Sequence, residues 1–181
     1  MAHPFFTIGH ATRPIEEFVG LLQGVSVTFL VDVRTVPRSR TNPQYNRETL
    51  PKTLEVLQIG YEHVAALGGL RSRNREVPRE TNAFWQNGSF HNYADHAMGA
   101  TFHEGLNHLR ELGRERRCAI MCAETLWWRC HRRIITDYLL AAGETVFHIL
   151  GPGEVRQAEI NAAAHVQPSG NLTYPAQSAV S

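Results

Sequence analysis

The chain has 181 residues, of which 43% are hydrophobic and 19% charged, and its formal net charge at pH 7 is +1. This length suits one domain that buries a core without disulfides or a structural metal, and the composition is that of an ordinary globular protein. No run of 18 apolar residues and no basic-then-apolar leader is present, and the cysteines number three, so we expect no membrane partner and a reducing, cytoplasmic location.

The basic residues are strongly biased toward arginine. All but one of the 18 lysines and arginines are arginine, the exception being Lys52. Arginine binds phosphate through paired hydrogen bonds and also stacks on bases. The bias therefore favours a nucleotide or nucleic-acid partner, although a GC-rich genome that replaces lysine throughout would leave the same pattern.

The first part of the chain alternates apolar strands with an amphipathic helix. Residues 5–8 predict a strand, and the periodic segment after it predicts a helix that ends near Gly24. Residues 27–33 are apolar except for Thr28 and Asp32. A run of this kind is typical of a strand buried on both faces of a parallel sheet.

The middle of the chain holds two segments without regular periodicity. Residues 34–45 contain two prolines and three arginines and predict an irregular loop. Residues 47–57 predict a short helix, and residues 60–64 a third strand. Residues 65–92 show no sustained periodicity, and a segment of this length inside a domain is usually a binding loop or a lid.

The last part repeats the strand and helix alternation. Residues 93–116 predict one helix broken near Gly99, or two short ones. Residues 118–122 form a short apolar run that predicts a fourth strand, and a periodic helix follows it. Residues 145–150 predict a fifth strand. We expect residues 151–181 to form a short helix and a loose tail.

The predicted order of elements indicates an α/β fold. Strands and helices alternate along residues 1–150, without a repeat or a break in composition. The expected architecture is one domain, a three-layer sandwich with a mostly parallel sheet of about five strands and helices on both faces.

Polar side chains follow the ends of four predicted strands. They are His10, Asp32 with Arg34, His63, and Cys122 with Glu124. Because the carboxyl ends of parallel strands share one edge, where α/β proteins bind ligands, we expect most of these groups to converge. The structural alternatives are an ion pair of Asp32 with Arg34 and a helix-capping role for Glu124.

One candidate chemistry is thiol catalysis by Cys122, which lies at a strand end before a helix. A helix N-terminus and nearby arginines stabilise a thiolate. Six residues separate Cys122 from Arg129, with no glycine among them, so the spacing differs from the C-x5-R phosphate loop of tyrosine phosphatases. A cysteine-dependent phosphatase or sulfur transferase therefore remains an alternative.

A metal site is not expected. Cys122, Cys130 and His131 lack a close C-x2-C pair and an evident fourth ligand. Cys130 lies four residues before Ile134, so core packing is its expected role. We expect neither a metal nor a cofactor.

The third chemistry is cleavage of an N-glycosidic bond, which a carboxylate assists by stabilising a sugar cation or positioning water. The departing base needs hydrogen bonds to its edge and an aromatic surface. Candidates for the base edge are Asn42, Gln44 and Asn46, and candidates for stacking are Tyr45, Trp85, Trp127 and Trp128.

The same residues resemble a known family. The motifs are T-I-G-H-A-T-R at 7–13, L-V-D-V-R-T-V-P-R-S-R-T-N-P-Q-Y-N at 30–46, L-G-G at 67–69, M-C-A-E at 121–124 and W-R-C-H-R at 128–132. Together they resemble domain of unknown function family 488. The resemblance implies a small α/β domain whose motifs gather at the strand ends, but it does not choose a reaction. It implies one site made of His10, Asp32, Arg34, Asn42, Cys122, Glu124, Arg129 and His131.

The leading hypothesis from the sequence is a DNA glycosylase-like hydrolase that removes a modified or damaged base. Asp32 or Glu124 would be the catalytic carboxylate, and His10 and Cys122 would line the pocket. The expected substrate-binding residues are Asn42, Gln44, Tyr45, Asn46, Trp128 and His131, with Arg34, Arg38, Arg129 and Arg132 on phosphates. DNA is favoured over RNA, and a non-catalytic nucleotide or nucleic-acid binding module is the second alternative.

Overall fold

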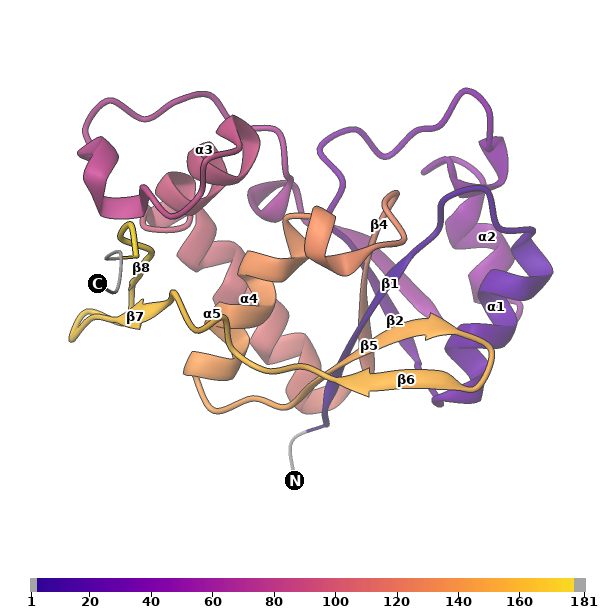
Figure 1. Ribbon diagram of the computed structural model, residues 1–181. Helices are drawn as coiled ribbons and strands as arrows, with labels where there is room; N and C mark the ends of the chain where they lie inside the picture. The colour runs from indigo at the N-terminus through magenta and orange to yellow at the C-terminus, as the bar shows by residue number, and fades with distance from the viewer. Residues whose placement is uncertain (1–2, 178–181) are drawn as a thin grey trace.

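The computed structural model describes residues 3–177 and contains one main sheet flanked by helices (Figure 1). The strands of this sheet are β1 (Phe5–Gly9), β2 (Phe29–Asp32), β3 (Gly60–His63), β4 (Cys118–Cys122), β5 (Val146–Gly151) and β6 (Glu154–Gln157). The helices are α1 (Ile15–Gly24), α2 (Leu50–Glu55), α3 (Gly88–His96), α4 (Ala100–Glu115) and α5 (Arg132–Ala141), and the 3-10 turns are η1 (Pro43–Tyr45), η2 (Ala65–Leu67), η3 (Arg79–Asn82) and η4 (Trp127–Arg129).

The main sheet has the strand order β3-β2-β4-β1-β5-β6. The first five strands are parallel to their neighbours, and β6 pairs antiparallel with β5. β4 and β1 lie in the centre, and every residue of both strands is buried. The predicted α/β fold class is confirmed, with a sixth, antiparallel strand added at one edge.

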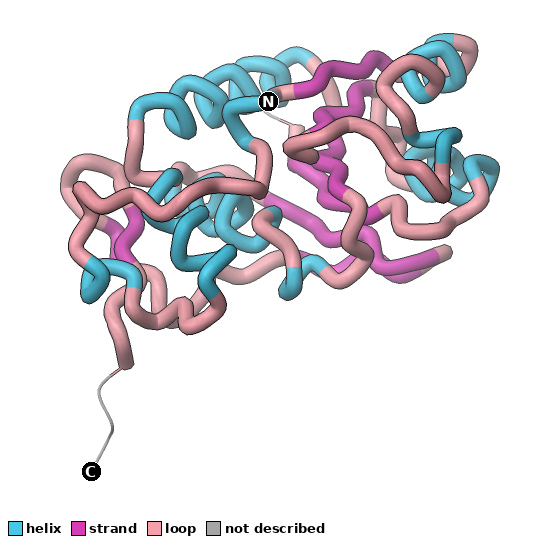
Figure 2. The backbone as a smooth tube through the Cα atoms, turned by 90° about the horizontal axis from the view of Figure 1, so that it is seen from above, coloured by secondary structure: helices cyan, strands magenta, loops and turns pink. Residues whose placement is uncertain are grey.

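Two groups of helices cover the two faces of the sheet (Figure 2). α1 and α2 pack Phe18, Leu22 and Leu54 against one face. On the other face, α3, α4 and α5 form the larger core, which includes Tyr93 and Ile134. Because each β-strand projects alternate side chains to opposite faces, both cores draw on the same central strands.

The segment 65–92 is more ordered than its lack of periodicity predicts. It contains η2, η3 and the first turns of α3, where the Asn87 side chain accepts hydrogen bonds from the backbone nitrogens of Ser89 and Phe90. The predicted break near Gly99 separates α3 from α4, since Gly99 is the N-cap residue of α4. Single turns of this kind leave no helical period in the sequence.

The C-terminal segment differs from the expected short helix and loose tail. After β6, the described residues to 177 include a two-stranded hairpin of β7 (His165–Val166) and β8 (Leu172–Thr173). Leu172 and Tyr174 are fully buried, and the Tyr174 ring packs edge-on against Trp85. Burial of these two side chains holds a segment whose polar composition suggested a tail; residues 178–181 lie outside the described part.

The topology brings the carboxyl ends of the central strands to one edge of the sheet. Gly9 of β1 is in register with Cys122 of β4, and Asp32 of β2 is in register with Met121 and with His63 of β3. The groups predicted to converge therefore follow adjacent strands. Among residues 3–177, no helix has the length and apolar character needed to cross a membrane.

Candidate functional site

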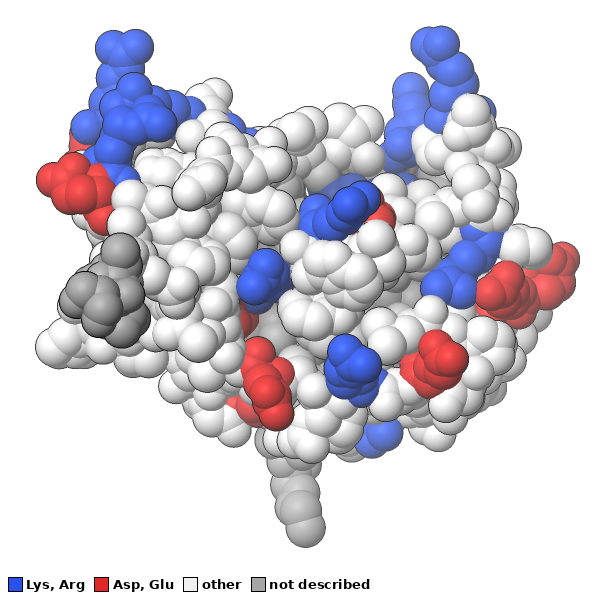
Figure 3. All heavy atoms as spheres, in the orientation of Figure 1, with Lys and Arg blue, Asp and Glu red and all other residues white. Residues whose placement is uncertain are grey.

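A cavity of about 530 Å³ opens at the carboxyl ends of β1, β2 and β4. Two arginine-bearing loops rise on either side of this edge, one after β2 and one before α3 (Figures 1 and 3). Of the residues expected at the site, the cavity is lined by His10, Arg34, Arg38, Cys122, Glu124, Arg129 and His131. The strand-end argument thus identifies much of the cavity wall.

The floor of the cavity is built by close contact between β1 and the turn after β4. A Cβ atom on Gly9 would lie 2.0 Å from the Glu124 carbonyl oxygen. The backbone nitrogens of His10 and Ala11 donate hydrogen bonds of 2.9 and 2.8 Å to the Cys122 and Ala123 carbonyls. Only glycine permits this approach, which aligns His10 with Cys122 across the floor.

Two thiols lie in contact in the cavity wall. The Sγ atoms of Cys122 and Cys130 are 2.7 Å apart. Both side chains line the cavity and are otherwise buried. Cys130 directly precedes the N-cap residue of α5. Its Sγ accepts hydrogen bonds from the Arg132 backbone nitrogen at 3.4 Å and from Arg132 Nε at 3.3 Å. The helix N-terminus and a guanidinium therefore both face Cys130.

Arg132 is a buried cation that contacts the Sγ atom of Cys130. Its side chain is 1% exposed, and among the described residues it forms no ion pair with a carboxylate. Its remaining hydrogen bonds go to Thr7 Oγ1 and to the carbonyls of Glu124 and Thr125. Because a buried charge needs a partner, ionised Cys130 is the natural counter-ion of Arg132.

His131 is oriented to act as a base toward Cys130. Its Nε2 donates a 2.7 Å hydrogen bond to the Val33 carbonyl, which turns Nδ1 toward Cys130. Nδ1 lies 3.5 Å from Cys130 Sγ. A Cβ atom on Gly69 would lie 2.5 Å from the same Nδ1, so the Gly69 backbone packs directly against the ring.

These contacts separate the acidities of the two thiols. Burial raises the pKa of Cys130, but the hydrogen bond from Cys122 and the adjacent His131 and Arg132 outweigh burial and bring this pKa well below its usual value. Burial and the hydrogen bond with Cys130 raise the pKa of Cys122 well above its usual value. Cys130 is thus the thiolate, and Cys122 is the thiol that donates to it.

Asp32 lies beneath the cavity and not in its wall. Its Oδ1 accepts from Arg34 N and Nε, and its Oδ2 accepts from Arg34 Nη2 at 2.6 Å and from the Tyr61 hydroxyl at 2.5 Å. The Asp32 side chain is fully buried. Both oxygens are therefore committed to holding Arg34, which corresponds to the structural alternative stated for this residue.

His10 is held as a neutral ring. Its Nδ1 donates to the Ala11 carbonyl at 2.9 Å, its Nε2 faces Arg34 Nη1 at 3.3 Å, and its ring stacks on Tyr45 at 4.2 Å. Burial, reinforced by Arg34, lowers the pKa of His10 to about 4. His10 therefore shapes the floor and orients Arg34, which also donates to the Tyr45 carbonyl.

The loop residues expected to bind a base instead organise the loop itself. The Gln44 amide and the Tyr45 hydroxyl both donate to the Arg13 carbonyl, and the Asn46 side chain accepts from Ser39 N. The Asn42 amide donates to Thr41 Oγ1. None of the four expected residues, Asn42, Gln44, Tyr45 and Asn46, lines the cavity. Their polar groups are used within the fold, which sequence spacing does not reveal.

The rim is polar and mostly exposed. Arg129 is exposed, and Arg38 pairs with Glu48 at 3.2 Å on the surface. Glu124 is exposed, and its Oε1 accepts from Leu126 N at 3.0 Å. This contact caps the turn after β4, and Oε2 forms no hydrogen bond within residues 3–177. Trp128 is 44% exposed and does not line the cavity.

Sequence reasoning missed Cys130 as a site residue and assigned it to the core. The available signal was its place next to His131, directly before a predicted helix. Reasoning from the sequence also missed the second wall, which comes from the segment before α3 and consists of Gly69, Leu70, Asn87, Ser89 and Phe90. Within residues 3–177, no group of three or more histidine, cysteine or acidic side chains is arranged to hold a metal ion.

A comparison with protein-family models gives a match that covers residues 14–139. The matched model is described as "Domain of unknown function DUF488". The matched range contains β2, β4, both loops of the cavity rim and the two contacting thiols. Neither the curated proteins nor the solved structures give a match to the chain.

Proposed function

The chain belongs to the family described as Domain of unknown function DUF488, and because that description assigns no activity, we propose a function from the site: a cysteine-dependent sulfur transferase acting on anionic substrates. The observation that carries this proposal is the contact of Cys122 and Cys130, 2.7 Å apart in the wall of a cavity with an arginine rim. Cys130 is the nucleophile, and Cys122 is the second thiol.

The surroundings of Cys130 meet the requirements of an activated nucleophile. A catalytic thiol needs a lowered pKa or an adjacent base, and the base needs a third group to orient it. Arg132 and the α5 N-terminus stabilise the thiolate, His131 Nδ1 is the adjacent base, and the Val33 carbonyl orients His131. These four groups come from α5, its N-cap residue and the residue directly after β2, so the fold holds them in place.

In the first step, the Cys130 thiolate attacks the outer sulfur of a donor R–S–S⁻. The sulfur–sulfur bond of the donor breaks, R–S⁻ leaves with its electron pair, and Cys130 becomes a persulfide. In the second step, an acceptor nucleophile attacks the terminal sulfur, and the Cys130 thiolate leaves. No net oxidation of the protein occurs in this cycle.

Cys122 can resolve the Cys130 persulfide when no acceptor is bound. Its sulfur attacks the inner sulfur of the Cys130 persulfide, its proton passes to the departing sulfur, and hydrosulfide leaves. The two thiols are thereby oxidised to a disulfide while the transferred sulfur is reduced, and an external thiol must then restore the pair. The 2.7 Å contact places Cys122 close to the geometry that this step needs.

The cavity favours an anionic substrate. Arg34 is buried with its guanidinium at the cavity wall, and Arg38 and Arg129 lie at the rim. Among the described residues, Glu124 is the one acidic side chain that lines the cavity. Its volume of about 530 Å³ accommodates a small molecule or one nucleotide unit.

Phosphoryl transfer by Cys130 is less well supported. A cysteine phosphatase surrounds the phosphate with successive backbone N–H groups, usually in a glycine-containing loop. The turn from Ala123 to Arg129 has no glycine, and its Glu124 carbonyl points at Gly9. A second thiol in contact also has no role in phosphoryl transfer, whereas sulfur transfer uses it directly.

The test uses thiosulfate as donor and cyanide as acceptor, with thiocyanate as the measured product. In this assay sulfite leaves from the donor, and the cyanide carbon takes the terminal sulfur from Cys130. We expect thiocyanate formation by the intact chain and a loss of at least about a hundredfold in Cys130→Ala. Cys118→Ala is the matched control, since Cys118 is buried away from the cavity, and it should retain full activity.

We propose base removal from DNA as a second candidate, because Glu124 offers a carboxylate oxygen at the same cavity. The position of Asp32 leaves Glu124 as the catalytic carboxylate of that reaction. Incubation with oligonucleotides carrying a panel of modified bases, followed by alkali, measures abasic sites. Cleavage that is lost in Glu124→Gln and retained in Cys130→Ala would favour this candidate over sulfur transfer.

A further inference from the structure

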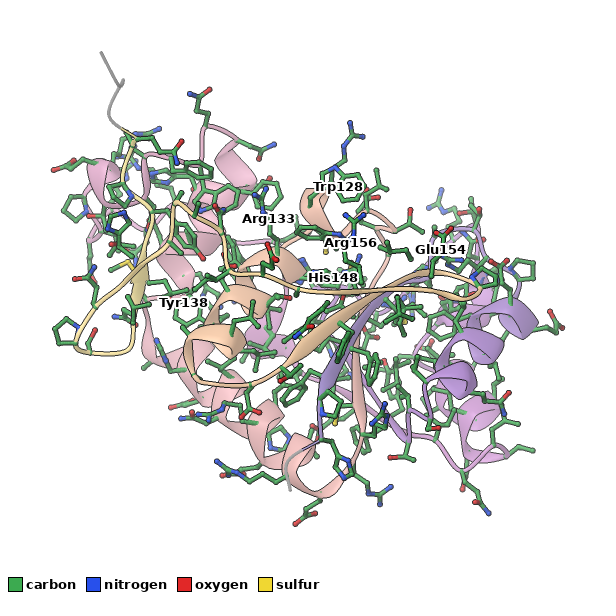
Figure 4. The ribbon with its side chains drawn as sticks, turned by 60° about the horizontal axis from the view of Figure 1, so that its bottom comes forward. Trp128, Arg133, Tyr138, His148, Glu154 and Arg156 are labelled. Atoms are coloured by element: carbon green, nitrogen blue, oxygen red, sulfur yellow. The ribbon has the colours of Figure 1, made fainter. Side chains whose placement is uncertain are left out.

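A second cavity, of about 660 Å³, lies on the other side of the η4 turn. It shares no lining residue with the first cavity. Its walls come from η4, α5, the β5–β6 edge of the sheet and the segment 157–162. Figure 4 labels three of its residues, Arg133 of α5, His148 of β5 and Arg156 of β6, which lie around the same region of the molecule.

Three buried polar atoms in this cavity have no hydrogen-bond partner among the described residues. They are Trp127 Nε1, Thr136 Oγ1 and Asn161 Nδ2, and all three residues line the cavity. Thr136 is only 2% exposed. Native proteins seldom leave buried polar atoms unpaired, and all three of these atoms are hydrogen-bond donors. The wall of the cavity therefore holds three donors that the fold itself does not use.

Two arginines add positive charge to the same cavity. Neither the Arg133 nor the Arg156 side chain forms an ion pair or hydrogen bond within residues 3–177. The Arg133 guanidinium carbon lies 5.1 Å from the centre of the Trp85 ring and 6.0 Å from that of Trp127. Stacking on these rings orients the guanidinium and leaves its edge available to an acceptor.

Within residues 3–177, the acidic side chains of this wall form no ion pair with either arginine. Asp137 accepts from Asn161 N with Oδ1 and from the Tyr174 hydroxyl with Oδ2, each at 2.9 Å. The remaining acidic residue in the wall, Glu159, is exposed. His148 is hydrogen-bonded to Thr7 at 2.7 Å, and burial lowers its pKa to about 3, so it is neutral.

The Trp127 donor is fixed in direction. Its ring stacks on His148 with 4.3 Å between ring centres and 3° between planes. Because His148 is itself held by Thr7 in the core, Trp127 Nε1 cannot turn away to find another partner. A rigid indole donor, an amide, a hydroxyl and two guanidinium groups together match an acceptor with several oxygens.

We propose that this second cavity binds a phosphate group, either as inorganic phosphate or as the phosphomonoester of a small metabolite. A tetrahedral group with three or four oxygens takes donors from several directions, as the placement of Trp127, Thr136 and Asn161 requires. A planar carboxylate accepts hydrogen bonds mainly in one plane. Each of the two arginines can donate two hydrogen bonds to a phosphate group. The site is independent of the sulfur-transfer proposal.

The test is calorimetric titration of the intact chain with inorganic phosphate at constant ionic strength, with parallel titrations of ribose 5-phosphate and acetate. We expect phosphate or the phosphomonoester to bind, and acetate to bind at least about tenfold more weakly. Whichever of inorganic phosphate and ribose 5-phosphate has the lower Kd indicates whether the cavity binds free phosphate or a phosphomonoester. Failure of both phosphate forms to bind would overturn the proposal.

Variants locate the binding. Thr136→Val and Arg133→Gln should each raise Kd by about tenfold or more, a loss of about 1.4 kcal/mol. Thr136→Val is nearly isosteric and removes an unpaired hydroxyl, so its Tm should not fall. Ser89→Ala, in the first cavity, is the matched control and should bind normally. Unchanged affinity in both variants, or an equal loss in Ser89→Ala, would place the anion elsewhere and contradict the proposal.

Discussion

At the scale of single residues, Cys130 in the cavity and Cys118 in the core differ in the pKa of their thiols. The pKa of Cys130 is lowered, whereas burial raises the pKa of Cys118 to about 12. We predict that iodoacetamide alkylates Cys130 in the folded protein at a rate that rises less steeply with pH than the rate of an ordinary thiol, and that Cys118 does not react. Peptide mass spectrometry after timed quenching measures both rates. A Cys130 rate that rises tenfold per pH unit up to pH 9 would contradict the lowered pKa.

Asp32 has a structural role, and a substitution at this position can distinguish a loss of stability from a loss of catalysis. Asp32→Asn leaves the Arg34 guanidinium buried without its counter-ion, so we predict a loss of about 3–5 kcal/mol in the free energy of unfolding. Tyr61→Phe removes one hydrogen bond to the same carboxylate and should cost about 1 kcal/mol. Urea denaturation measures both values. If Asp32→Asn lost activity at wild-type stability, Asp32 would be a catalytic group instead.

Two buried histidines determine how stability depends on pH. Burial lowers the pKa of His10 to about 4 and that of His148 to about 3. On acidification below about pH 6.5, the unfolded chain takes up protons that the folded protein excludes, so stability falls. Burial raises the pKa of Asp137 to about 6. Between pH 6 and 4 the folded protein therefore binds a proton at Asp137 more readily than the unfolded chain, and the resulting gain in stability offsets the loss caused by one histidine.

The net prediction is a free energy of unfolding that is highest above pH 6.5. It should fall by up to about 1.4 kcal/mol per pH unit for each uncompensated histidine. Urea denaturation at intervals from pH 7.5 to 4.5 measures the slope, and Asp137→Asn should steepen it below pH 6. Constant stability across this range would mean that the two histidines are protonated in the folded protein.

Residue types at strand ends were predictable from the sequence, but their roles were not. His10, Arg34, Cys122 and Glu124 line the cavity, as the parallel-strand argument predicts. Asp32 follows the same rule in sequence, yet its side chain turns under the floor to pair with Arg34. The side-chain direction depends on packing against Tyr61 of the neighbouring strand, which no local pattern encodes.

At the scale of elements, close backbone approach joins the segments that carry the site. Gly69 follows η2 and packs against His131, so Gly69→Ala forces the ring or the backbone to move. We predict a drop of about tenfold or more in thiocyanate formation with a cooperative unfolding transition retained. Gly20→Ala is the control, because a Cβ there meets nothing within 4 Å and a helical alanine should slightly raise Tm. Equal activity of the two variants would show that the ring position is unimportant.

Strands were easier to predict than short turns. Residues 118–122 coincide with β4, because a continuous apolar run needs no neighbour to be recognised. The 3-10 turns η2 and η3 contain three and four residues, too few to show a period. The C-terminal hairpin was also missed, since its stability depends on the burial of Leu172 and Tyr174 against distant elements.

At the scale of the whole molecule, the arginines do not form one continuous band on the face shown in Figure 3. Basic side chains rise at two corners of this face, with further groups between them (Figure 3). The two corners belong to the loops on either side of the first cavity (Figure 1). This arrangement directs an anion into the cavity between the loops and favours a small substrate over a long duplex.

The central claim is that Cys130 accepts sulfur in this cavity. The most direct measurement is mass spectrometry of the reduced protein after brief incubation with thiosulfate and removal of excess donor. One additional sulfur atom on the peptide that contains Cys130, absent from the Cys118 peptide and lost on treatment with cyanide, is the predicted result. An unmodified Cys130 peptide, or equal modification of Cys118, would contradict the sulfur-transferase assignment.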